Sequence, residues 1–258
     1  HILTLVRTDT HQVCDVAVTE YLKWSKTQKH LHKLFRVGVN CFDVRKHRLP
    51  IDPYCLGVIL GDGGMTHGYV SVTNSDPEVG AALMVLEQGF NIKIREGKNT
   101  SGCPRFNLSH EDGIRKGRNR NLLISALRDL GLMGCGAGSK FVPHEYKTSL
   151  VGHRMDVLAG LLDTDGHLSC NTYDYISKSE RLAGDVAFLA RSLGLAAYVK
   201  ECTKTWQNGE GQYWRVSISG SVEKLPLRVL RKRARPRRQK KNALRTGFRI
   251  IETGNDDE

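Results

Sequence analysis

Two short apolar segments that each end in Asp-Gly constrain the fold of this 258-residue chain more than any other feature. The clearer copy, LAGLLDTDG, occupies residues 158–166, and a looser copy, LGVILGDG, occupies residues 56–63. Both segments are predicted to be helices that carry small residues at helical spacing: Gly57 and Gly61 in one, Ala159 and Gly160 in the other. Small residues let two helix backbones approach closely, so the sequence predicts that these helices pack against each other.

Such a contact would bring the terminal acids of the two segments, Asp62 and Asp165, to one place. Two converging carboxylates form a divalent-metal site, and oxygen ligands of this kind favour magnesium. A single Asp-Gly pair more often just closes a helix and starts a turn, but two copies in matching surroundings favour the metal site. Asp163 has Leu60 at the matching place in the first copy, so we expect it to be a helix-end or interface residue rather than a ligand.

The surroundings of the two segments indicate an internal duplication. Each acid is followed by a strand-rich stretch, a capping sequence that opens a helix, and two further strands. In the first half these are 68–73, Ser75 to Glu78 with helix 79–88, and strands 90–95 and 105–108, followed by helix 121–130. In the second half they are 167–176, Ser177 to Glu180 with helix 182–193, and strands 196–200 and 213–219, followed by a weaker helix 222–230 that Pro226 interrupts. The predicted fold class is α+β, with two pseudo-symmetric αββαββα subdomains that each offer a curved antiparallel sheet.

This interpretation divides the chain into a first subdomain at 51–150 and a second at 151–242. Residues 1–50 look like the edge of another domain, and residues 243–258 return toward it. Between 228 and 241, nine of fourteen residues are Lys or Arg, a run that suggests a clamp on DNA phosphates, with a localisation signal, an RNA-binding tail or a solvated loop as alternatives.

Charge and composition narrow the class of partner. Lys and Arg outnumber Asp and Glu by 39 to 27, which gives a net charge of +12 and favours nucleic acid. No segment approaches the roughly 18 consecutive apolar residues of a membrane span, and no signal peptide opens the chain, so we expect a soluble, cytoplasmic protein without a membrane partner. The seven scattered cysteines have no Cys-x-x-Cys spacing, which argues against structural zinc and a disulfide framework.

The two motifs resemble those of the LAGLIDADG homing endonucleases, in the two-motif, single-chain form found in inteins, over roughly residues 50–242. The resemblance implies that Asp62 and Asp165 are catalytic and bind Mg²⁺, for which Mn²⁺ can substitute. It also implies a basic residue near each scissile phosphate: Lys140 for the first half and, for the second, a member of the run 231–233, of which we choose Lys232. A solvated or merely phosphate-contacting lysine is the alternative at Lys140.

The family lays its sheets in the major groove of DNA, which makes cations on the predicted strands candidate DNA contacts. They are Arg95, Lys98, Arg105, Lys200, Lys204 and Arg215, together with Arg231 and Arg233 of the basic run. Some of these side chains are expected to be only solvated.

The predicted function is a site-specific double-strand DNA endonuclease that acts as a monomer on a long asymmetric target and hydrolyses phosphodiesters by direct attack of water. The rival prediction is a catalytically silent binding protein on the same fold, either an RNA maturase or a transcription regulator. The flanks suggest an intein: 1–6 resembles the strand after the splicing histidine, which would be His1, and 248–257 resembles the approach to the C-terminal block. This stretch lacks the terminal splicing residues and is not expected to splice alone. Exteins of a host protein would be its partners. The alternative is a free-standing or intron-encoded endonuclease whose two ends are unrelated to an intein.

Overall fold

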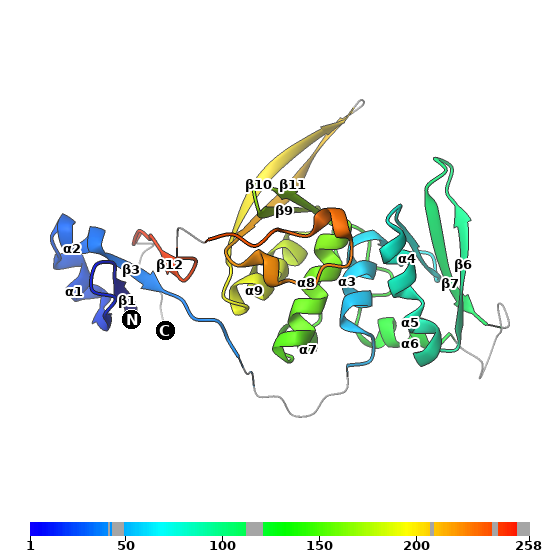
Figure 1. The fold of residues 1–258 in the computed structure, drawn as a ribbon, viewed down its shortest axis with the longest axis horizontal. Helices are drawn as coiled ribbons and strands as arrows, with labels where there is room; N and C mark the ends of the chain where they lie inside the picture. The colour runs from blue at the N-terminus through cyan, green and yellow to red at the C-terminus, as the bar shows by residue number, and fades with distance from the viewer. Residues whose placement is uncertain (41, 43–48, 112–120, 207–208, 239–241, 252–258) are drawn as a thin grey trace, which may run out of the picture.

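The computed structural model describes residues 1–40, 42, 49–111, 121–206, 209–238 and 242–251. Within these residues the strands form three separate four-stranded antiparallel sheets, two of which flank a central helix pair while the third lies at one end of the molecule (Figure 1). None of the helices in this part of the chain is long and apolar enough to cross a membrane.

The central pair consists of α3 (Pro53–Asp62) and α8 (Val151–Asp165). Residues 54–60 and 157–163 are buried on every side, as expected for helices that are apolar all round. A Cβ added to Gly57 would lie 2.3 Å from the Val157 carbonyl oxygen, and one on Gly160 would lie 2.3 Å from that of Tyr54. The predicted close approach of the two motif helices is therefore confirmed, and only glycine permits it at these two positions.

Each half repeats one order of elements around its central helix. In the first half α3 is followed by β4 (Gly63–Gly64), β5 (Val70–Thr73), α4 (Pro77–Leu83), α5 (Val85–Gly89), β6 (Ile92–Lys98), β7 (Pro104–His110) and α6 (Leu122–Asp129). In the second, α8 is followed by β8 (Gly166–Ser169), β9 (Thr172–Ser177), α9 (Glu180–Ser192), β10 (Ala196–Trp206) and β11 (Gly209–Ser219). The sheet orders, β4-β5-β7-β6 and β8-β9-β11-β10, are the same, so the α+β class and its antiparallel sheets are confirmed.

The strand registers of the two sheets also correspond. Gly63 pairs with Val72 as Gly166 pairs with Tyr175, and on the other side of the strand Arg105 pairs with Thr73 as Arg215 pairs with Ile176. This correspondence aligns the two halves residue by residue without reference to their side chains.

Two helix predictions were wrong. The helix predicted at 79–88 is interrupted at Met84, where hydrogen bonds span three residues instead of four, so α4 and α5 are separate. The helix predicted at 222–230 is absent: only the 3₁₀ turns η1 (Val222–Lys224) and η2 (Leu230–Lys232) form, because Pro226 donates no hydrogen bond and holds Leu225 extended. The second half therefore lacks the closing helix of the αββαββα pattern.

Neither predicted capping sequence acts as expected. Asp76 is the N-cap of α4 but makes no capping bond with its side chain, which instead accepts two hydrogen bonds from Arg231. Ser179 rather than Ser177 caps α9, with its hydroxyl accepting from the Leu182 amide. The sequence located both helix starts to within a few residues but misassigned the residues that cap them.

The third sheet has the order β12-β3-β1-β2 and combines the two ends of the described chain. It comprises β1 (Ile2–Arg7), β2 (Val13–Ala17), β3 (His32–Phe35) and β12 (Arg245–Thr246), with α1 (Val18–Lys23) and α2 (Lys26–Leu31) between β2 and β3. Its core around Leu5, Val16 and Tyr21 is separate from the main core. The buried Arg154 of α8 holds the segment that follows β3 against the second half, because its guanidinium donates to the Val39 carbonyl and to Ser192.

Candidate active site

The acids of the two motifs are the last residues of the two packed helices. Asp62 ends α3 and Asp165 ends α8, and the glycine after each acid is the C-cap. A Cβ on Gly63 would lie 2.2 Å from the Ile59 carbonyl oxygen, and one on Gly166 would lie 2.5 Å from that of Leu162. The chain therefore needs glycine to turn sharply from helix to strand, and this turn places each carboxylate at the edge of a sheet.

The two carboxylates interact electrostatically. Burial, and then the negative charge of Asp62, raises the pKa of Asp165 to about 6, although Lys140 and Lys232 oppose the shift. Burial also raises the pKa of Asp62, against a hydrogen bond of 2.6 Å donated by the Asn74 amide. Asp165 is nevertheless solvent-exposed, because its side chain lines an open pocket. Two mutually repelling carboxylates with one open side fit a divalent cation, whose charge would remove the repulsion.

Lys140 and Lys232 occupy equivalent places at the two helix ends. The Lys140 ammonium donates to the carbonyl oxygens of Gly61 and Gly63, at 2.9 and 2.8 Å. The Lys232 ammonium donates to those of Leu162, Asp163 and Thr164, at 3.3, 2.8 and 2.7 Å. Each lysine thus binds the last carbonyls of the helix that carries the acid, where a cation is favourable. This symmetry resolves the ambiguous run at 231–233 in favour of Lys232 as the positional counterpart of Lys140.

Asp163 is an interface residue, as the sequence predicts. Its buried carboxylate accepts a hydrogen bond of 2.7 Å from the Tyr54 hydroxyl and one of 2.6 Å from the Arg228 amide. The Arg228 guanidinium lies 3.9 Å from the centre of the Tyr54 ring. Asp163 therefore connects the segment around Arg228 to the motif helix of the first half.

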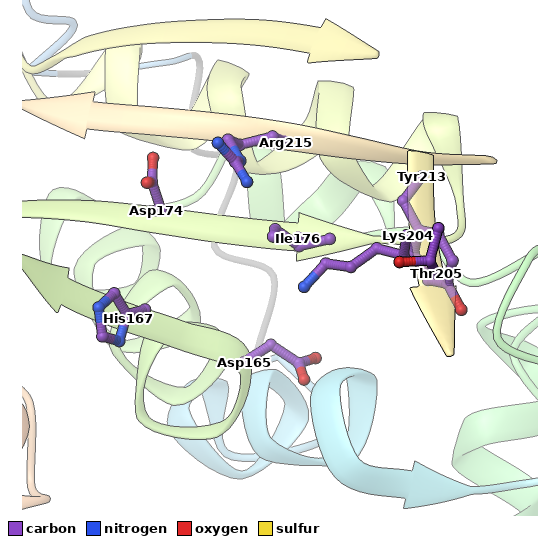
Figure 2. Close-up of a pocket in the computed structure, with 8 residues that line it drawn as sticks. All are labelled: Asp165, His167, Asp174, Ile176, Lys204, Thr205, Tyr213 and Arg215. Carbon is purple, nitrogen blue, oxygen red and sulfur yellow. The ribbon is translucent and has the colours of Figure 1, made fainter. Parts of the chain in front are cut away.

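The predicted cations of the second sheet share one face. Lys200, Lys204 and Arg215 have the same parity in the paired strands β10 and β11, and Arg215 lies between Lys200 and Ile176 in the register. Lys204 and Arg215 line a pocket of about 690 Å³ that Asp165 closes at one end. Figure 2 shows Lys204 extending into this pocket above Asp165, while Arg215 projects toward the strand that carries Ile176.

The first sheet separates its predicted cations. Arg95 and Arg105 lie on its polar face, where Arg95 donates to Ser109 and Arg105 donates to Ser71 at 3.2 Å. Lys98 has the opposite parity: it pairs with Pro104 at the hairpin end and alternates in phase with the core residue Ile94. Strand alternation thus places Lys98 away from the face that carries the other two cations.

The basic run has protein partners along much of its described part. Arg231 makes a bidentate contact with Asp76 at 2.9 and 2.7 Å, and Arg233 donates to the Leu227 carbonyl at 2.7 Å. Arg237 donates to the Cys170 carbonyl at 3.0 Å. These contacts make the run a strap across both halves; residues 239–241 of the predicted clamp lie outside the described residues.

Sequence reasoning missed several polar residues of these faces. Asn74 was missed because nothing in its local sequence indicates that its amide reaches Asp62. Others are found on the polar faces by strand alternation once the register is known: Lys93, Asn107, His167, Asp174 and Tyr213. Alternation within the strands was the available signal, but it needed the strand ends that only the structure provides.

Two motif helices that end in paired acids beneath two antiparallel sheets with basic residues define a pseudo-symmetric acid centre. Comparison with family models gives this class a name for one part of the chain: residues 153–227 match the model of the LAGLIDADG-like domain. The matched part includes α8 from His153 onward and the whole second sheet, and it is similar to a LAGLIDADG-like domain.

Relatives of the chain include a replicative DNA helicase, DnaB, of Mycobacterium intracellulare, which is 29% identical over 217 residues. The match covers 83% of this chain, but the chain spans only 31% of the length of that relative. Among solved structures, the chain is similar to I-DmoI in complex with DNA and Ca, with a TM-score of 0.45, 15% identity and coverage of 66% of this chain and 83% of that one. The complex of I-DmoI with DNA and Mn gives a TM-score of 0.44 at 17% identity, with coverage of 66% and 89%.

Proposed function

We propose that this protein is a metal-dependent, site-specific endonuclease for double-stranded DNA. The observation that carries the proposal is the pair Asp62 and Asp165, held at the ends of two glycine-packed helices between two sheets with basic faces. One acid serves each half, and each half faces its own stretch of duplex. A single chain that contains both halves acts as a monomer and recognises a long asymmetric site.

The carboxylates of Asp62 and Asp165 would hold Mg²⁺, for which Mn²⁺ can substitute. The described residues contain no cluster of three or more His, Cys, Asp or Glu side chains able to hold a metal. The remaining ligands would therefore be backbone carbonyls, water and the phosphates of bound DNA. A bound divalent ion supplies activation of the attacking water and stabilisation of the leaving 3′ oxygen.

The other residues of the site position and bind the substrate. Lys140 and Lys232 hold their helix ends in place and set positive charge beside the acids, which favours the charge that develops on the phosphate. Arg95, Arg105, Lys200, Lys204 and Arg215 contact the duplex from the two sheet faces, and exposed parts of Arg231 and Arg233 contact phosphates at the rim. Lys98 is the weakest of the predicted contacts because of its parity in β6.

We further propose that the chain is the nuclease region of an intein. The sheet that joins β12 to β3 returns the end of the nuclease to the N-terminal region, as insertion into a splicing domain requires. The relative named as a helicase is about three times longer than the matching segment, as expected of an insert within a host protein, whose exteins would then flank it. The boundaries 1–50, 51–150, 151–242 and 243–258 remain our proposed division.

The experiment that tests the function is cleavage of a plasmid that carries the host gene with the insert precisely removed from its coding sequence. Wild-type protein should give linear DNA with Mg²⁺ and none with EDTA. Asp62→Asn and Asp165→Asn should each lower cleavage by about 10²-fold or more. Asp156→Asn, a change on the same helix far from its C-terminal end, serves as the matched control and should cleave normally.

Binding of this plasmid without cleavage, with either Mg²⁺ or Mn²⁺, would overturn the nuclease and favour a silent DNA-binding protein. Tight binding of an RNA in place of DNA would favour the maturase. Equal activity of Asp165→Asn and wild type would remove Asp165 from the catalytic site.

A further inference from the structure

The aligned registers show where the polar faces of the two sheets differ. Arg105 and Arg215 are equivalent. Arg105 lies opposite Thr73, four residues before α4 begins, and Arg215 lies opposite Ile176, four residues before α9 begins. The next cross-strand pair beside each arginine on the same polar face differs between the two sheets. In the first sheet Ser71 lies opposite Asn107, whereas in the second Asp174 lies opposite Ser217. An acid therefore stands in the second half where the first half has a hydroxyl group.

Asp174 is an unusual residue for its surroundings. It lines the same pocket as Lys204 and Arg215, on the face proposed to meet DNA, and His167 lies opposite it on β8 (Figure 2). The Ser217 hydroxyl donates to Asp174 Oδ1 at 2.7 Å. Among the residues that the structure describes, none forms an ion pair with this carboxylate. Asp174 thus presents a negative charge, oriented by Ser217, to the space that the duplex would occupy.

We propose that Asp174 determines base specificity by accepting a hydrogen bond from the exocyclic amino group of a cytosine in the second half-site; this inference rests on the proposed DNA-binding function. A carboxylate is negatively charged, so it repels phosphates. It also only accepts hydrogen bonds, so its partner on the DNA must be a donor. The donors in the major groove are adenine N6 and cytosine N4. Adenine carries the N7 acceptor beside N6, which would face the carboxylate unfavourably, whereas cytosine has no acceptor beside N4. Cytosine is therefore the base that the chemistry selects.

Ser217 is the positioning residue of this contact. Its hydroxyl occupies one lone-pair site on Oδ1 and fixes the orientation of the carboxylate. Arg215, diagonal to Asp174 in the register, suits the O6 and N7 atoms of guanine. Because Arg105 is its equivalent in the first sheet, the arginines give both half-sites a similar guanine contact. Asp174 distinguishes the second half-site from the first.

The test is selection of bound sequences from a random duplex library, with cleavage blocked by EDTA, for wild type and variants. When the selected sequences are aligned, each column of the alignment is one base position of the site. Wild type should enrich sequences in which one column is cytosine. Asp174→Ala should lose about tenfold or more of the discrimination at that column and leave the others unchanged. Asp174→Asn should shift the column toward adenine, because an amide both accepts from N6 and donates to N7. Ser217→Ala should weaken the preference for cytosine without changing its identity.

Glu201→Gln is the matched control, since Glu201 lies on β10 with the opposite parity to Lys200, and no column should change. A uniform gain in affinity for Asp174→Ala, with every column retained, would show that Asp174 only repels phosphate and would overturn the inference. A wild type that enriches no sequence would overturn the proposed site-specific function itself. Melting curves of the variants, expected to match wild type for this surface position, separate loss of contact from loss of fold.

Discussion

The two halves of this protein share a backbone but treat their acids differently. In the first half the Asn74 amide donates to Asp62, and the Lys140 ammonium donates two hydrogen bonds to backbone carbonyls. In the second half Ser177, the counterpart of Asn74, accepts a hydrogen bond from the Ser179 amide, as Asn74 does from the Asp76 amide. Asn74 differs in that it also donates to its acid, and Lys232 differs from Lys140 in that it donates to three carbonyls. The elements that bring the acids together are thus duplicated, whereas the groups that support each acid have diverged. Two centres with different support are expected to act on their strands at different rates.

The largest expected effect tests the contact on which both halves depend. Gly160→Val should prevent stable folding, because its Cβ would lie 2.3 Å from the Tyr54 carbonyl oxygen and 3.0 Å from Gly57 Cα. The matched control is Gly152→Ala in the same helix, where an added Cβ would have no heavy atom within 4 Å. This substitution should stabilise the protein by up to about 1 kcal/mol. Denaturant unfolding followed by circular dichroism measures both. Comparable stability of the two variants would contradict the close approach.

A smaller effect distinguishes the two lysines. Lys140→Met should lower cleavage by about 10²-fold, because the carbonyls of Gly61 and Gly63 use only two of its three donors and leave one for water or phosphate. Lys232→Met should lower it by about tenfold, since three carbonyls already occupy that ammonium. Single-turnover cleavage of the host-gene plasmid gives both rates. A larger loss for Lys232→Met would reverse the assignment.

The Asn74 contact predicts a difference between strands. Asn74→Ala should slow one strand by about tenfold, the loss expected for one hydrogen bond to a charged group, and leave the other strand unaffected. Ser177→Ala should change the rates less, because its hydroxyl bonds the Ser179 amide. Denaturing gels of a duplex labelled on either strand separate the two nicks. Equal slowing of both strands by Asn74→Ala would show that the acids act only as a unit.

The smallest effect is a pH-dependent gain in stability. Since the pKa of Asp165 rises from 3.8 to about 6 on folding, the unfolded chain loses this proton first, and ionisation destabilises the folded state as the pH rises through this interval. In EDTA, Asp165→Asn should therefore melt a few degrees above wild type at a pH above about 6. The difference should fade as the pH falls below the unfolded pKa of 3.8, where the Asp165 carboxyl is protonated in both the folded and the unfolded state. Asp62→Asn should gain less, because Asn74 already favours the charged form.

A pH-independent increase for Asp165→Asn would mean that charge repulsion between the acids does not cause the gain. Addition of Mg²⁺ to wild type should raise its melting temperature above pH 6, since bound cation stabilises the folded state by mass action. Asp165→Asn should respond less to the same concentration.

The sequence by itself determined the duplication, the close helix pair, the α+β class and the two acids. These features depend on local rules: glycine spacing on a helix, the Asp-Gly termini, and apolar periodicity along short segments. The segment before the second helix also singled out Lys140 through its resemblance to the family pattern; the structure places its ammonium at the end of α3, and its catalytic role stays a prediction. The local rules for caps and helix ends were less reliable: both capping sequences were misassigned, and the helix predicted at 222–230 does not form.

Only the tertiary structure decided the features that depend on contacts between distant segments. Asn74 reaches Asp62, Lys232 rather than its neighbours reaches the end of α8, and Arg231 bonds Asp76 instead of remaining a free cation. The face of Lys98 and the place of Asp174 opposite Ser217 depend on strand register, which shifts every side chain to the other face when it slips by one residue. Register and long-range hydrogen bonds are set by packing of the whole core, so a reading of neighbouring residues could not supply them.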